Sequence, residues 1–342
     1  MKTKIVITDC TDPHINLAAE EHLTFGCSRG EVIMYLWQNA DTVVIGRNQN
    51  PWQECRIEEM KKNGCALARR LSGGGAVYHD LGNLNFTFIA RSEDYDVMKQ
   101  TGVILGAVKS LGIKAERNGR NDLVIPSEGN ESGLKFSGHA YYRYKDFRYH
   151  HGTVMVDVDP SPLSLYLNVP ADKLKSKSVT SVKSRVTNLN NHAPDITIAK
   201  MHEALIEAFC KIYQKPRDGG IIRLNSDSEF YKTPEMVSLI AKYDSEKWNY
   251  GRRIPFDLEI KSRFPWGGVT AQIHVIGGVI KDAAIYSDSL ETEIFSKIAM
   301  SLNGLNYSIE GVNKLPDAFV GEGEEDLRIA SDVADMIIEE LK

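Results

Sequence analysis

The segment ARRLSGGGAVYHD (68–80) carries the strongest local signal for chemistry in the chain. Three consecutive glycines between two strand-like runs let backbone amides approach a ligand closely, and successive N–H groups can form a concave anion site. Arg69 and Arg70 lie just before the glycines, separated from them by Leu71 and Ser72. If they lie in a strand, only one guanidinium faces the site, where it could bind a carboxylate or a phosphate. A flexible turn beside a surface ion pair fits the same spacing. The segment matches neither the P-loop nor the dinucleotide-binding glycine pattern.

Two further segments place polar side chains beside strand-like runs. In GRNDLVI (119–125), Asp122 could hold Mg²⁺ on nucleotide phosphates, or it could simply end a turn. In LKFSGHA (134–140), Lys135 could reach a phosphate as a mobile point charge, although most lysines are only solvated. His150 and His151 should point to opposite faces of a strand, which makes them a poor pair of metal ligands.

Length and composition predict a two-domain cytoplasmic protein with no membrane segment. The chain has 342 residues, 42% of them hydrophobic and 25% charged, which suits a globular protein with a large and a small domain. It contains no run of about 18 apolar residues, and its start lacks the apolar stretch of a signal peptide. Five scattered cysteines favour neither disulfides nor structural zinc.

The net charge of −5 argues against a nucleic-acid partner bound through a general phosphate-facing surface. One local group of basic side chains is either a solvated face or a surface that steers an acidic partner protein. This basic group consists of Lys173, Lys175, Lys177, Lys183 and Arg185.

Strands and helices alternate over the first 245 residues. Asp12 and Pro13 indicate the start of a helix that ends near residue 27. Further helices are expected near 52–63, 95–111 and 197–213. Strands are expected at 4–8, 32–37, 42–46, 66–70, 84–90, 122–126, 134–144 and 151–157.

A polar segment at 245–255 interrupts this pattern, and a second unit follows it. Residues 267–286 read as two alternating strands joined at Gly277 and Gly278. Helices near 289–303 and 326–341 would cover one face of that hairpin. The sequence therefore predicts a large unit of alternating strands and helices, followed by a new, smaller unit.

The chain resembles the lipoate–protein ligase family through an ordered series of motifs that spans nearly its whole length. The glycine loop differs from the loop that is usual in the related biotin ligases. The resemblance implies an α/β protein with a mixed sheet, in which a biotin/lipoate ligase-like catalytic domain at 1–245 is followed by a small α+β accessory domain at 255–342. The motifs are DTVVIGRNQNPWQEC (41–55), RRLSGGGAVYHDLGN (69–83), GRNDLVI (119–125), KFSGHA (135–140), HHGT (150–153), SVKSRVTNL (181–189), WNYG (248–251) and FPWGGV (264–269).

The resemblance also implies a reaction and its partners. Lipoate and ATP, with Mg²⁺, give lipoyl-AMP and pyrophosphate. A lysine of an acceptor lipoyl domain, in a 2-oxoacid dehydrogenase subunit or the glycine-cleavage carrier, then takes the lipoyl group and AMP is released. Lys135 is the implied catalytic residue, bridging the activated carbonyl and the α-phosphate. The implied substrate- and ATP-binding residues are Arg70, Ser72, Gly73, Gly74, Gly75, Ala76, Val77, Tyr78, His79, Asn83, Lys135, Ser137 and His151, with Asp122 as the candidate Mg²⁺ ligand.

Two alternatives stay open at this point. On the same fold, an acyltransferase moves octanoyl or lipoyl groups between carrier proteins without ATP, often through a cysteine nucleophile. A non-catalytic binder would hold lipoyl proteins without consuming ATP. The accessory domain disfavours the first alternative, and the intact set of motifs disfavours the second.

Overall fold

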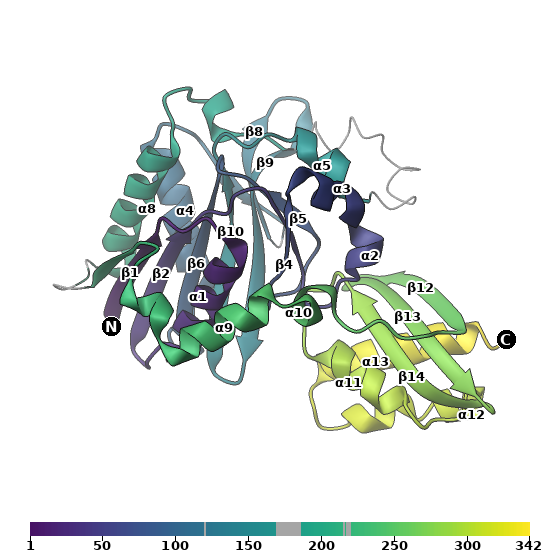
Figure 1. Cartoon of the computed structure of the whole chain (residues 1–342). Coiled ribbons are helices and arrows are strands. Elements are labelled where there is room, and N and C mark those ends of the chain that lie inside the picture. The colour runs from purple at the N-terminus through teal and green to yellow at the C-terminus, as the bar shows by residue number, and fades with distance from the viewer. Residues whose placement is uncertain (120, 169–185, 215, 217–219) are drawn as a thin grey trace. The chain divides into compact units, whose positions relative to one another are not determined.

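A computed structural model describes residues 1–119, 121–168, 186–214, 216 and 220–342, and these form two compact units (Figure 1). The first unit comprises Met1–Val44, Trp52–Arg69 and Ala76–Asn249. The second unit comprises Tyr250–Lys342 together with two short loops, Ile45–Pro51 and Arg70–Gly75. Most of the predicted glycine loop therefore clusters with the C-terminal residues.

Among the described residues, the first unit is built on a mixed sheet of eight strands, in the order β11-β1-β2-β6-β10-β9-β8-β7. Strand β1 pairs in parallel with β2 and β11, and the other neighbours pair antiparallel. The mixed sheet predicted from the sequence is confirmed. The strands are β1 (Lys2–Thr8), β2 (Glu31–Trp37), β6 (Asn83–Arg91), β7 (Glu116–Asn118), β8 (Asp122–Ser127), β9 (Asn130–Tyr144), β10 (Phe147–Met155) and β11 (Ile221–Leu224).

Helices cover both faces of this sheet (Figure 1). Helices α4 (Val97–Ser110) and α8 (Ile198–Tyr213) pack together over the main hydrophobic core, which includes Phe86 and Phe88. The predicted apolar stripe of α8 supplies Met201, Leu205 and Phe209 to that core. Helices α1 (Pro13–Gly26) and α9 (Pro234–Asp244) pack together on the other face.

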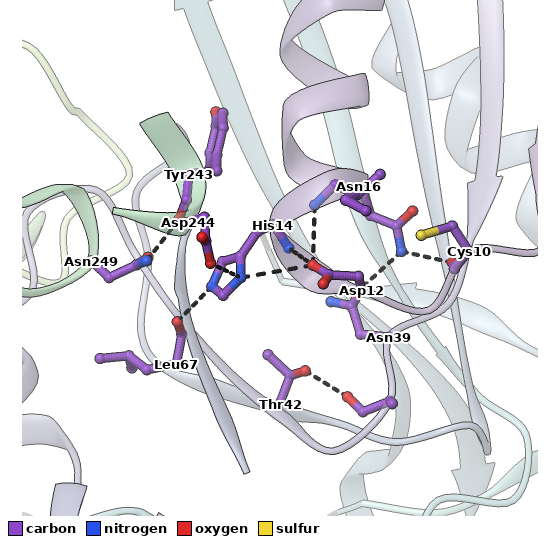
Figure 2. Close-up of polar contacts among 12 residues, drawn as sticks. Cys10, Asp12, His14, Asn16, Asn39, Thr42, Leu67, Tyr243, Asp244 and Asn249 are labelled. Carbon is purple, nitrogen blue, oxygen red and sulfur yellow. Dashed lines mark hydrogen bonds and ion pairs between the residues drawn. The ribbon is translucent and has the colours of Figure 1, made fainter. Parts of the chain in front are cut away.

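The first turn of α1 is fixed by side chains that the sequence places there (Figure 2). Asp12 caps the helix, because its Oδ1 accepts hydrogen bonds from the backbone N–H groups of His14 at 2.8 Å and Ile15 at 3.2 Å. The fully buried Asn16 donates from Nδ2 to the Cys10 carbonyl at 3.0 Å and to Asn39 Oδ1 at 3.0 Å. These bonds tie α1 to the loops that follow β1 and β2, and so fix the helix over the sheet.

A smaller sheet with the order β4-β3-β5 and several short helices complete the described part of the first unit. The helix expected near 52–63 is two helices, because the intervening Cys55 forms a β-bridge with Leu167 and Arg56 N–H donates to the Tyr166 carbonyl at 2.8 Å. The elements are β3 (Thr42–Ile45), α2 (Pro51–Glu54), α3 (Ile57–Asn63), β4 (Ala66–Arg69), β5 (Val77–His79), α5 (Ser161–Tyr166), the 3₁₀ helices η1 (Leu189–Asn191) and η2 (Glu229–Lys232), and α10 (Glu246–Tyr250).

The C-terminal part of the second unit, residues 250–342, forms an antiparallel sheet of three strands, β12-β13-β14, around its own hydrophobic core. The predicted hairpin and both covering helices are confirmed. Strand β12 was not predicted, so the hairpin is one part of a larger sheet. The elements are β12 (Leu258–Phe264), β13 (Gly267–Ile276), β14 (Val279–Ser287), α11 (Ile294–Leu302), α12 (Ile309–Val312), the 3₁₀ helix η3 (Leu315–Phe319) and α13 (Glu324–Glu339).

Some sequence predictions fall on residues that lie outside the described ranges. The basic group at 173–185 lies there, and so does most of the motif at 181–189, of which Val186 to Leu189 are described. Arg120 of the motif at 119–125 also lies outside. In the part of the chain that is described, no helix combines the length and the apolar character needed to cross a bilayer.

Candidate functional site

In the second unit, the glycine loop is folded around the guanidinium of Arg70. Arg70 Nε donates to Ser72 Oγ at 3.0 Å, and Nη2 donates to the carbonyls of Gly73 at 2.7 Å and Gly75 at 2.8 Å. Both Arg70 and Ser72 are buried. Because these bonds of the guanidinium go to its own loop, an anion that binds Arg70 must share the cation with these oxygens or displace them.

The glycines of this loop serve close backbone packing. Gly74 N–H donates to the Ser289 carbonyl at 2.9 Å, and a Cβ on Gly73 would lie 2.1 Å from that same oxygen. A Cβ on Gly46 would lie 2.1 Å from the Gly74 carbonyl oxygen. The sequence predicts that successive N–H groups of this loop can form an anion site. The Gly74 N–H is not open for that role, because it donates to the Ser289 carbonyl. Gly75 has open space around it.

Arg69 takes a different course from Arg70, as the alternation of a strand predicts. Its Nε donates to the Trp248 carbonyl at 2.9 Å and its Nη2 to the Asn249 carbonyl at 2.8 Å. Asn249 Oδ1 accepts from the Arg69 backbone N–H at 3.0 Å. Figure 2 shows Asn249 bonded in turn to the Tyr243 carbonyl. Arg69 therefore holds Trp248 and Asn249 of the WNYG motif to β4 within the first unit.

The residues after the glycine loop belong to the first unit, where β5 carries three of the predicted contacts. Ala76 and Val77 are half-buried. The Tyr78 hydroxyl donates to Asp41, and burial together with this bond raises the pKa of Tyr78. The hydroxyl is thus protonated and turned toward Asp41.

His79 and Asn83 lie in polar pairs of the same unit. Asn39 Nδ2 donates to His79 Nδ1 at 3.2 Å, which leaves the histidine Nδ1 as an acceptor. The rings of His79 and Trp37 meet edge to face at 6.3 Å between centroids. Asn83 Nδ2 donates to Asn85 Oδ1 at 2.9 Å. These bonds fix the orientation of both side chains before any ligand binds.

His151 belongs to a buried polar network under α1. Its Nδ1 lies 2.8 Å from Glu20 Oε1, and Thr87 Oγ1 donates to the same oxygen at 2.6 Å. Trp37 Nε1 donates to Thr87 Oγ1 at 3.0 Å. A buried carboxylate needs such partners, because desolvation disfavours its charge. Sequence reasoning missed Glu20. The spacing of Asn16, Glu20 and Thr24 every four residues along the buried face of α1 was the available signal.

His150 points to the other face of the sheet, as expected, and joins a second buried network. Ser137 Oγ lies 3.0 Å from His139 Nε2, His139 Nδ1 lies 3.0 Å from His150 Nε2, and His150 Nδ1 lies 3.1 Å from Gln100 Oε1. Sequence reasoning gave His139 no role, yet it links the predicted site residue Ser137 to α4. The Ser137 side chain is fully buried and faces His139.

These two histidines predict a specific loss of stability in acid. Burial, and after it the charge of Lys135, lowers the pKa of His139 to about 3. Burial lowers the pKa of His150 well below its usual value. The pKa of histidine in an unfolded chain is about 6.5. Below that pH the unfolded chain therefore binds protons at these two positions, while both histidines of the folded chain stay neutral. Between pH 7 and pH 5 the free energy of unfolding should fall by about 2 kcal/mol for each histidine.

Urea unfolding at pH 7 and pH 5 measures this fall. His139→Gln should reduce the fall by removing one of the two groups. Equal unfolding free energies at the two pH values in the unmodified protein would contradict the assignment of both histidines as neutral.

Lys135 lies in β9 beside Asp122 in the neighbouring β8. Lys135 Nζ is 2.8 Å from Asp122 Oδ1, and both side chains are little more than one-third exposed. The backbone of Lys135 forms a bridge to Val186, and its carbonyl accepts from Thr187 N–H at 2.8 Å. The two predicted charged residues are thus brought together. The structure pairs Asp122 with a lysine. Among the described residues, Asp122 is not part of any group of three carboxylate, histidine or cysteine side chains that could hold a metal ion.

Four of the five cysteines lack the features of a nucleophile. Cys27, Cys55 and Cys65 are buried, and burial raises the pKa of each thiol to about 12. Burial also raises the pKa of the half-buried Cys10. A thiol with a raised pKa holds little of the reactive thiolate at neutral pH.

Single replacement of each of the five cysteines by Ser or Ala should leave at least about one tenth of the ligation activity that the family resemblance implies, in every variant that folds. Lipoylation of an acceptor domain, followed by mass spectrometry, measures this activity. An acyl-thioester detected on any cysteine during turnover would instead support the ATP-independent transferase.

Comparison with known protein families assigns both parts of the chain. Residues 12–210 match the lipoyl protein ligase A/B catalytic domain. The chain belongs to this family. Residues 253–322 match the C-terminus of bacterial lipoate protein ligases, so the lipoate ligase family accounts for the C-terminal residues as well.

Solved structures of lipoate ligases are similar to the chain over much of its length. LipL1 of P. falciparum in complex with lipoate is 29% identical, with a TM-score of 0.83 over 98% of this chain and 99% of that one. The bi-partite lipoate protein ligase of Thermoplasma acidophilum, analysed with its E2 lipoyl domain, is 28% identical, with a TM-score of 0.63 over 75% of this chain and 100% of that one. A lipoate-protein ligase A bound with ATP is 28% identical, with a TM-score of 0.57 over 73% and 99%.

Proposed function

We propose that this family member is an ATP-dependent lipoate–protein ligase that activates lipoate as lipoyl-AMP and transfers the lipoyl group to a lysine of an acceptor lipoyl domain. The observation that carries the proposal is the match of residues 253–322 to the C-terminus of lipoate protein ligases, in addition to the catalytic-domain match. The ATP bound to a similar ligase supports the use of ATP. The E2 lipoyl domain analysed with another supports the class of acceptor.

In the first step, a carboxylate oxygen of lipoate attacks the α-phosphorus of ATP and pyrophosphate leaves. Carboxylate and phosphate are both anionic, so the reaction needs cations that hold them in line for attack. We assign these charges to Lys135 and Arg70. Lys135 is an accessible ammonium, and Arg70 is a buried guanidinium already ordered by its own loop. The Arg70 guanidinium is therefore ordered within its own unit before the substrates bind.

In the second step, the acceptor amine attacks the carbonyl of lipoyl-AMP, and AMP leaves with loss of one proton from the amine. The mixed anhydride itself carries the activation, so no residue of this chain has to be acylated. The raised pKa values of the buried cysteines agree with a route that needs no enzyme nucleophile.

Mg²⁺ enters this proposal as part of the nucleotide substrate. The candidate ligand Asp122 is paired with Lys135, and the described residues include no cluster of three carboxylate, histidine or cysteine side chains. A resident metal site therefore does not fit these residues. Mg²⁺ commonly binds through substrate phosphates and water with few protein ligands, and we route no step through a metal held by the protein.

We further propose that residues 1–245 form the catalytic domain and that residues 255–342 have an accessory role. The catalytic domain alone should transfer the lipoyl group from lipoyl-AMP, whereas activation of lipoate should also need the accessory residues. A cytoplasmic location stays a prediction. Pyrophosphate release in the absence of any acceptor tests the proposed function. It should require lipoate, ATP and Mg²⁺ together, and a protein that releases none under these conditions would not be this ligase.

A further inference from the structure

The catalytic ammonium of Lys135 lies over a glycine and beside a carboxylate on one face of the β8–β9 pair. Asp122 is directly opposite Gly138 in the ladder, and residues opposite each other on neighbouring strands share a face. A Cβ on Gly138 would lie 2.9 Å from Lys135 Nζ. The ammonium is therefore confined between the Asp122 carboxylate and the bare backbone of Gly138.

A β-bulge explains how Lys135 reaches this face. Leu123 opposes Ser137, but the next residue, Val124, opposes Lys135, so Phe136 is an extra residue in β9. In a regular strand, Lys135 and Ser137 would point to the same side. The extra residue reverses that relation, because a bulge re-aims the side chains before it. Ser137 then enters the buried histidine network, and Lys135 projects toward Asp122 instead.

The ion pair has little to contribute to folding. An ion pair that remains partly exposed is screened by water and adds little to stability. Its main physical effect is on the lysine side chain, whose rotatable bonds would otherwise let the ammonium sample many positions. The pair and the glycine beneath it restrict the ammonium to one of them.

We propose that Asp122 is a positioning residue for Lys135, holding its ammonium over Gly138 before the substrates bind. The cation then needs little reorganisation when carboxylate and α-phosphate arrive, which is how preorganised charges lower a barrier. This inference rests on the proposed function for its effect on rate. It replaces the sequence expectation that Asp122 is a Mg²⁺ ligand, since that role would draw the carboxylate away from Lys135.

The decisive variant is Asp122→Asn, which keeps the side-chain shape and removes the charge. We expect kcat for lipoate-dependent pyrophosphate release to fall about 10- to 100-fold, as for a misplaced catalytic group. The KM for ATP and the Mg²⁺ concentration that gives half the maximal rate should stay unchanged. Gly138→Ala should lower kcat as well, because its Cβ displaces the ammonium. Its effect should not add fully to that of Asp122→Asn.

Asp146→Asn is the matched control, since its carboxylate pairs with Arg91 at 2.7 Å with similar exposure but outside the site. It should retain activity. A second readout needs no turnover. In the substrate-free protein, acetic anhydride should modify Lys135 faster in Asp122→Asn than in the unmodified protein, with Lys232 as an internal reference scored by peptide mass spectrometry.

Each outcome decides between specific claims. An Asp122→Asn enzyme whose rate is restored by more Mg²⁺ would make Asp122 a metal ligand and overturn the positioning role. Unchanged kcat with unchanged Lys135 acetylation would overturn it too. If the unmodified protein releases no pyrophosphate, the proposed function fails, and the acetylation result alone then decides whether Asp122 holds Lys135.

Discussion

Lys135→Ala should reduce lipoyl-AMP formation by about 10² to 10⁴ while the protein remains folded. Charge-assisted hydrogen bonds contribute roughly 1.5–3 kcal/mol each, and the variant loses those to the carbonyl and to the α-phosphate in the transition state. The side chain is partly exposed and lies outside both hydrophobic cores, so its removal leaves no cavity. Pyrophosphate release, measured with saturating lipoate and ATP, gives the rate.

Lys232→Ala is the matched control, because Lys232 Nζ also lies 2.8 Å from a carboxylate, that of Glu229, but at the surface. The control should keep its full rate. A folded Lys135→Ala protein that releases pyrophosphate at near the normal rate would remove Lys135 from the mechanism, whatever the family resemblance implies.

Removal of residues 251–342 should abolish activation of free lipoate, yet spare transfer from supplied lipoyl-AMP to an acceptor lysine. The loops Ile45–Pro51 and Arg70–Gly75 cluster with Tyr250–Lys342, so the cut removes the packing partners of the predicted nucleotide loop. Within that unit, Gly74 N–H loses its bond to Ser289, and the bond of 2.8 Å from Asn48 Nδ2 to the Thr292 carbonyl is lost as well. Loops without packing partners are flexible, so binding of ATP must also order them. The entropy lost in that ordering weakens binding.

The assay compares both half-reactions for the full-length and truncated proteins, after circular dichroism has shown that residues 1–250 fold. Addition of separately produced residues 251–342 is the control, and it should restore activation. A truncated enzyme that activates lipoate as fast as the whole chain would show that the C-terminal residues have another role, such as docking the acceptor.

Local chemistry made much of the fold predictable. Asp12 and Pro13 announce the start of α1, the Gly277–Gly278 pair marks the β13–β14 hairpin, and the apolar spacing of α8 identifies its buried face. Each of these features depends on neighbours within a few residues. Strand β12, with the sequence LEIKSRF, also alternates. It was missed because three of its seven side chains are charged, which is not typical of a strand.

The missed features depend on partners far away in the chain. The Gly74 N–H donates to the carbonyl of Ser289, more than two hundred residues later in the chain, and no local sequence pattern predicts that bond. The bulge at Phe136 depends on the register between β8 and β9, which sequence periodicity does not determine. The structural role of His139 depends on two distant residues, because its ring contacts His150, which in turn contacts Gln100 on α4.

The most direct test of the proposed function follows a single lipoyl group from free acid to protein. Purified protein is incubated with lipoate, MgATP and an unmodified lipoyl domain, and intact-mass spectrometry records the domain while AMP and pyrophosphate are quantified. We predict one lipoyl group on one lysine, with one AMP and one pyrophosphate formed per group, and no modification when ATP is omitted. Modification of the domain without ATP, from an acylated carrier protein, would contradict the ligase and establish a transferase.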